Sequence, residues 1–129
     1  MLAIDTNVVV RYLTGDHPSQ SAHARALIDG QPIVISTTVL LETEWVLRSV
    51  YGYEPVQLLK AIRAFAGLPS VTIHDPPLAA QALDWMEGGM DLADALHLAE
   101  AAGSEAFVTF DRRLVTTAKK LGVTGVRTP

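Results

Sequence analysis

The chain of 129 residues contains no cysteine. Disulfides, thiolate zinc sites and thiol catalysis are therefore excluded, and the composition is compatible with a reducing compartment. No apolar run approaches the roughly 20 residues that cross a bilayer, and the N-terminal segment lacks the basic start of a secretory signal. From these absences we expect a soluble, cytoplasmic protein without a membrane segment.

The sequence also lacks an excess of positive charge. It contains 10 Lys and Arg residues and 14 Asp and Glu residues, which gives a net charge of −4. Proteins that bind nucleic acids usually present a basic surface. Four acids lie beside or within strongly apolar segments, and setting them aside leaves ten acidic residues against ten basic ones. The negative balance is explained equally well by one acidic site or by an ordinary soluble surface.

Short β-branched runs alternate with longer stretches of helical period, which predicts an α/β domain with a parallel sheet covered by helices. We expect about six or seven helices and one domain over residues 1–129, because no linker or repeat interrupts the series. About five strands are expected, at residues 2–5, 33–36, 71–74, 106–109 and 123–127.

Asp5 and Asp111 each stand where an expected strand meets the following helix. The carboxyl edge of a parallel sheet is where α/β folds bind ligands, so the two acids would converge if their strands were neighbours. Each acid alone is also explained as a helix N-cap. Asn7 could orient Asp5 or fill a turn, and Thr109 could donate a hydroxyl or have no role.

Two further acids lie within predicted helices. Glu42 shares a helical face with apolar residues and is poorly explained as a solvated residue, although Glu44 competes for the same role. Asp94 follows Asp91 by three residues, and this spacing also suits a simple helix cap with a favourable dipole contact. His97 shares the face of Asp94, but a lone histidine is more often a surface residue than a ligand.

The chemistry of these acids favours hydrolysis of phosphodiesters. Oxygen ligands without cysteine or clustered histidine select Mg²⁺ or Mn²⁺, and such an ion can activate water and neutralise the leaving oxygen. No Ser–His or Cys–His pair stands out, so a covalent intermediate is not needed. The cations that could bind a phosphate backbone are Arg11, Arg48, Arg112, Arg113, Lys119 and Lys120.

In their order and spacing these segments resemble the PIN-domain ribonucleases, and among them the VapC-type toxins of bacterial toxin–antitoxin pairs. The motifs that carry the resemblance are Asp5-Thr6-Asn7, Leu41-Glu42, Asp94-Ala95-Leu96 and Thr109-Phe110-Asp111. The resemblance spans the chain and implies a PIN-like three-layer α/β fold with a central parallel sheet of about five strands. It also implies an endoribonuclease that depends on Mg²⁺ or Mn²⁺.

The resemblance also implies a role for individual residues and partners. It selects Glu42 over Glu44 and implies that Asp5, Glu42, Asp94 and Asp111 are catalytic residues that form one metal site. Asn7 and Thr109 are implied as supporting polar residues, and Asp91 as an outer ligand or a cap. The implied partners are an RNA substrate, a cognate antitoxin protein and a second copy in a homodimer.

Two other classes of protein share parts of this pattern. A receiver-like signalling module has paired acids after the first strand, an aspartate after the third and a lysine at the end of the last. Here Asp5 has no acidic neighbour, Asp75 does follow the third strand, and the lysine is lacking. A non-catalytic PIN-like binding domain is the other alternative, and cleavage of RNA separates it from an enzyme.

Overall fold

The computed structural model describes residues 1–129 and divides into two compact units, Met1–Pro76 and Pro77–Pro129. The chain forms seven helices and five short strands. No helix combines the length and the apolar character needed to cross a membrane. The expectation of a single domain over residues 1–129 stays a prediction.

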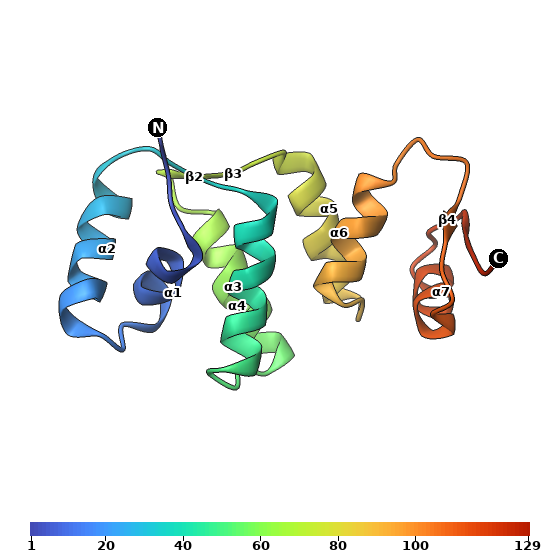
Figure 1. Cartoon of the computed structure of the whole chain (residues 1–129), viewed down its shortest axis with the longest axis horizontal. Helices are drawn as coiled ribbons and strands as arrows, with labels where there is room; N and C mark the ends of the chain where they lie inside the picture. The colour runs from blue at the N-terminus through green and yellow to red at the C-terminus, as the bar shows by residue number, and fades with distance from the viewer. The chain divides into compact units, whose positions relative to one another are not determined.

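The first unit is built on a parallel sheet of three strands, β1 (Leu2–Ala3), β2 (Ile33–Ile35) and β3 (Val71–Ile73), in that order (Figure 1). Ile33 of β2 lies opposite Leu2 of β1 and Val71 of β3. Its β-branched side chain is fully buried, which suits a central strand packed on the core.

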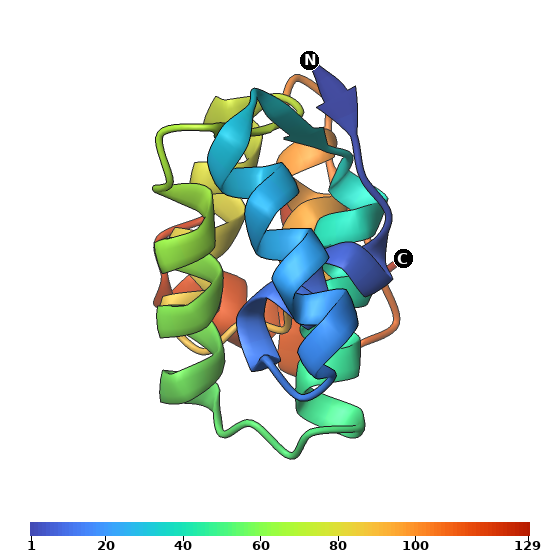
Figure 2. The same cartoon turned by 90° about the vertical axis from the view of Figure 1, so that its left-hand side faces the viewer.

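Four helices complete the first unit: α1 (Thr6–Thr14), α2 (Pro18–Gly30), α3 (Thr37–Ser49) and α4 (Pro55–Ala66). Helix α1 packs against α2 and α3, and α4 packs against α3 (Figure 1, Figure 2). Local chemistry sets the helix starts: Pro18 and Pro55 begin α2 and α4, and the Ser36 hydroxyl accepts a bond of 3.1 Å from the amide of Val39.

The second unit contains α5 (Pro76–Glu87), α6 (Leu92–Glu100) and α7 (Arg112–Lys120), with strands β4 (Phe107–Val108) and β5 (Val126–Arg127). The first residue of α5, Pro76, belongs to the first unit. Strands β4 and β5 pair in parallel, and α7 packs against β5. Gly88, after α5, leaves the space that the Leu121 side chain fills.

The predicted single central sheet of about five strands is wrong, because the strands form one sheet of three and another of two. Strand β1, which precedes Asp5, pairs with β2, and strand β4, which precedes Asp111, pairs with β5. The alternation of strand and helix predicts how many strands there are and that they run parallel. It does not determine which strand lies beside which, and β1, β4 and β5 are only two residues long.

Two glycines of the first unit give a matched test of this backbone. Gly15 ends α1 with a φ of 65°, whereas Gly30, the last residue of α2, has no positive φ and open space where a Cβ would lie. We expect Gly15→Ala to lower the free energy of unfolding by about 1–2 kcal/mol, because an L side chain strains the left-handed conformation. Gly30→Ala is expected to be neutral or to stabilise by up to about 1 kcal/mol.

Chemical denaturation of both variants measures the difference. Equal free energies of unfolding for the two variants would contradict the left-handed helix end at Gly15.

Candidate functional site

A pocket of about 350 Å³ lies in the first unit, where the start of α1 faces the middle of α3. Four of the predicted site residues line it: Asp5, Asn7, Arg11 and Glu42. They come from positions up to 37 residues apart in the chain, and the pairing of α1 with α3 brings them to one cavity. The first unit therefore joins two candidate acids with one candidate cation.

Asp5 is held in place by the helix that follows it. It adopts an extended conformation after β1, and its Oδ1 atom accepts a hydrogen bond of 2.7 Å from the amide of Thr6. The alternative interpretation as a helix N-cap is thus correct for Asp5. Capping and ligand binding are compatible, because a cap that uses one carboxylate oxygen fixes the group at the edge of the pocket.

Thr6 is a pocket residue that was not selected from the sequence. Its side chain is buried, it lines the pocket with Asp5, and its Oγ1 atom has no hydrogen-bond partner in the protein. A buried hydroxyl without a partner costs about 1–3 kcal/mol, so a water or ligand oxygen in the pocket would stabilise it. The sequence did contain a signal for Thr6, because it is a polar residue between Asp5 and Asn7, which were both selected as site residues.

The burial of the two glutamates of α3 is the reverse of that predicted. Glu44 is 3% exposed and pairs with Arg48 at 2.8 Å, whereas Glu42 is exposed. The expectation that Glu42 is poorly solvated was wrong, because the buried face of α3 carries Leu40, Glu44 and Leu47. Glu42 nevertheless lines the pocket with Asp5, and Glu44 does not.

Arg48 is therefore engaged within α3 by Glu44, and its predicted role in RNA binding stays a prediction. Arg11 is different, because it lines the pocket itself.

A hydrogen-bond network holds the Arg11 guanidinium at the pocket wall. Its Nη1 atom donates to Asp16 Oδ1 at 3.1 Å and to the Tyr51 hydroxyl at 3.2 Å, and its Nε atom donates to Gln20 at 2.8 Å. Tyr51 in turn donates to Asp16 at 2.6 Å. That bond is the largest cause of a lowered pKa of the Asp16 carboxyl, followed by the bond from Thr14. Asp16 thus stays ionised and keeps Arg11 fixed.

In the second unit, Asp91 and Asp94 share the start of α6. Asp91 caps the helix by accepting a bond of 3.3 Å from the amide of Asp94, so the capping interpretation is correct here as well. Burial is the largest cause that raises the pKa of Asp94, and the charges of Asp91 and Asp111 raise it further, while His97 lowers it. Asp94 is therefore in a field of like charge.

Asp111 caps α7, since its Oδ1 atom accepts bonds from the amides of Arg113 at 2.9 Å and Leu114 at 3.2 Å. The Thr109 hydroxyl accepts a bond of 3.0 Å from the amide of Asp111. Thr109 therefore supports the backbone that carries Asp111. Arg112 and Arg113 follow directly and are exposed to solvent.

The candidate acids occur in two sets, Asp5 with Glu42 in the first unit and Asp91, Asp94 and Asp111 in the second. No three histidine or acidic side chains are placed so that they could hold a metal ion together. The all-oxygen chemistry of both sets, the unpartnered Thr6 hydroxyl and the like charges around Asp94 nevertheless suit a hard divalent cation. The site of four carboxylates stays a prediction.

Comparison with known proteins gives one match to a family. The family model of the PIN domain matches residues 2–120. No curated protein matches the chain. The solved structure of Mycobacterium tuberculosis VapC20, a toxin that cleaves the sarcin–ricin loop, is 20% identical and covers 90% of this chain and 94% of its own, with a TM-score of 0.43. At that TM-score the likeness establishes neither a shared fold nor a shared function.

The surroundings of Asp94 predict how stability depends on pH. Between the usual aspartate pKa and the raised pKa of Asp94, the folded chain binds more protons than the unfolded chain. The contribution of Asp94 to the free energy of unfolding therefore falls as the pH rises through that interval. We expect Asp94→Asn to remove this contribution and to be at least as stable as the wild type at pH 7.

Denaturant unfolding between about pH 4 and pH 7 measures the effect. Glu100→Gln changes an exposed acid at the other end of the same helix and is the control, expected to retain the wild-type dependence. An unchanged pH dependence in Asp94→Asn would contradict the crowding of charge around Asp94.

Proposed function

The chain belongs to the PIN domain family, and from this membership we propose that it is a metal-dependent endoribonuclease that hydrolyses phosphodiester bonds in RNA. The observation that carries the proposal is the pocket shared by Asp5, Glu42 and Arg11. Two carboxylates can bind a divalent cation. The Nε and Nη1 atoms of Arg11 already donate to protein groups, and its Nη2 atom can donate to a phosphate oxygen. Hydrolysis of a phosphodiester uses both kinds of group, carboxylates that hold the metal and a cation that binds the phosphate.

Nucleases of the PIN family generally use divalent metal ions, and Mg²⁺ or Mn²⁺ is proposed here. The residues proposed to hold the metal are Asp5, Glu42, Asp94 and Asp111, with Asp91 as an outer ligand or a cap. When bound, the ion supplies an activated water and neutralises charge on the leaving oxygen.

The other groups of the chain bind and orient. Arg11, held by Asp16 and Tyr51, binds a phosphate oxygen beside the acids. Arg112 and Arg113, exposed after Asp111, contact the RNA backbone. Asn7 supports Asp5 at the pocket, and Thr109 supports Asp111 through the amide bond at its cap.

We further propose that the nuclease is the toxin of a VapBC-type pair, a cytoplasmic homodimer neutralised by a cognate antitoxin. The motifs of the VapC-type toxins in their order, in a chain of 129 residues, support this role. The acids of the pocket also offer a docking point for an arginine or lysine of the antitoxin.

The receiver-like alternative has less support. Asp75 follows β3 as that alternative requires, but it does not line the pocket of Asp5. A phosphorylated aspartate in a receiver shares its metal site with the acids after the first strand, so the separation of Asp75 from this pocket disfavours that function.

Cleavage of a mixture of transfer and ribosomal RNA tests the nuclease proposal. The purified chain should cut RNA with Mg²⁺ or Mn²⁺ and stop in excess chelator. Asp5→Asn and Glu42→Gln should each lower the rate of RNA cleavage by about 100-fold or more, because each replaces a negatively charged metal ligand with a neutral amide. Added metal should raise the unfolding temperature of the wild type more than that of either variant.

Glu44→Gln is the matched control on the same helix. It weakens the pair with Arg48, so it should lower the free energy of unfolding by about 1 kcal/mol and leave cleavage intact. Cleavage that continues in chelator would overturn the metal-dependent mechanism. An inactive Glu44→Gln beside an active Glu42→Gln would exchange the roles of the two glutamates.

Growth measurements test the toxin proposal. Expression of the wild-type chain alone should arrest bacterial growth, and Glu42→Gln expressed to the same level should not. Co-expression of the protein encoded by the neighbouring reading frame should restore growth and yield a stable complex. Normal growth at high levels of the wild-type chain contradicts the toxin role without contradicting RNA cleavage.

A further inference from the structure

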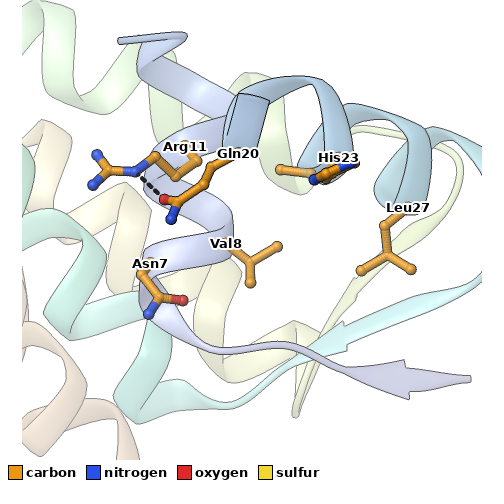
Figure 3. Close-up of a pocket in the computed structure, with 7 residues that line it drawn as sticks. Asn7, Val8, Arg11, Gln20, His23 and Leu27 are labelled. Carbon is orange, nitrogen blue, oxygen red and sulfur yellow. Dashed lines mark hydrogen bonds between the residues drawn. The ribbon is translucent and has the colours of Figure 1, made fainter. Parts of the chain in front are cut away.

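A second pocket, of about 270 Å³, lies between α1 and α2 within the first unit. Six of the residues that line it are Asn7, Val8, Arg11, Gln20, His23 and Leu27. Figure 3 shows Val8 of α1 and Leu27 of α2 pointing into the space between the helices, while the bond between Arg11 and Gln20 closes one end. Pockets that bind small molecules start at about 300 Å³. This pocket lies just below that size, so it has room for one ring system rather than for a larger ligand.

The lining of this α1–α2 pocket combines apolar and polar side chains, with Asn7, Arg11 and Gln20 toward one end and Leu27 at the other (Figure 3). Val8 and Leu27 offer aliphatic surface, and Asn7 and Gln20 carry amides, while none of the lining residues is acidic. An RNA base likewise combines apolar and polar surface, since its faces are apolar and its edges are polar. Side-chain amides match the donors and acceptors of base edges, and histidine is among the residues on which unstacked bases stack.

The α1–α2 pocket also adjoins the acidic pocket, because Asn7 and Arg11 line both. A phosphate bound to Arg11 would therefore lie between the acids on one side and the α1–α2 pocket on the other. Phosphates and nucleosides alternate along a nucleic acid strand, so each phosphate is flanked by two nucleosides. The group next to a phosphate at Arg11 is thus a nucleoside of the same strand, and the α1–α2 pocket, which no acidic side chain lines, is the place for its base.

We propose that the α1–α2 pocket binds an unstacked base next to the cleaved phosphodiester and so selects the sequence that is cut. The proposal rests on the proposed nuclease function and adds a specificity site to it. His23 stacks on the base, and Gln20 and Asn7 recognise its edge. Because Gln20 also bonds to Arg11, recognition of the base is linked to the position of the phosphate-binding guanidinium.

A pool of RNA with a randomised segment tests the proposal. The pool is cut by the purified full chain with Mn²⁺, and sequencing of the new ends gives the base preference at each position around the cut. The wild type should prefer one base, or one base class, directly beside the cut. His23→Ala should lower that preference by about fivefold or more, since it removes a stacking partner, and Leu27→Trp should lower it by filling the pocket.

Ala26→Trp introduces the same side chain on α2 at an exposed position that does not line the pocket, and it should keep the wild-type preference. His23 is exposed, so His23→Ala keeps the test valid where Leu27→Trp fails to fold. Equal preference for all bases in the wild type, or an unchanged preference in His23→Ala, would overturn the proposal. The same holds if the variants cut as the wild type does but lose affinity for a co-expressed protein partner, because the pocket would then bind that partner.

Failure of the nuclease function itself gives a different result. In that case the wild-type chain produces no new RNA ends, or produces the same ends as Glu42→Gln. A wild type that cuts, beside a Glu42→Gln variant that does not, isolates the question of base selection at the α1–α2 pocket.

Discussion

The capping of helix N-termini by aspartate is the interaction on which both candidate acid sets depend. Asp5, Asp91 and Asp111 each accept an amide hydrogen at the start of α1, α6 and α7. The unpaired amides of a helix N-terminus donate to a capping carboxylate, and the positive end of the helix dipole attracts it. A carboxylate that serves as a cap is also fixed in direction, which lowers the entropy lost when it becomes a ligand.

The helices could be predicted from the sequence because local chemistry sets their ends. Pro18 and Pro55 start two helices, and Ser36 and Asp111 cap two others, each through a contact within three residues. The sheets could not be predicted in the same way. Strands of two or three residues carry little pattern of their own, and their pairing is set by long-range packing. The single sheet was therefore expected where two smaller sheets form.

Asp5 and Asn7, which follow β1, could be selected from the sequence as pocket residues, whereas the buried glutamate of α3 could not. Apolar residues flank both Glu42 and Glu44, so periodicity alone did not identify the buried one, and the pair with Arg48 decides it. Long charged side chains can be buried when a partner lies one turn away, and no count of apolar neighbours reveals this. Thr6 was missed for a related reason. Its importance lies in a hydroxyl without a partner, and that is visible only when every neighbouring donor and acceptor is placed.

The net charge of −4 is a poor guide to RNA binding because charges act over short distances. At physiological ionic strength, exposed charges separated by more than about 8 Å are largely screened. A phosphate at the pocket wall would therefore interact mainly with Arg11 and with any metal between the acids. Asp16 neutralises part of the Arg11 charge, but with Tyr51 and Gln20 it also fixes the guanidinium in one orientation. Since Arg11 lines both pockets, that fixed orientation would relate the position of a bound phosphate to the position of a base in the α1–α2 pocket.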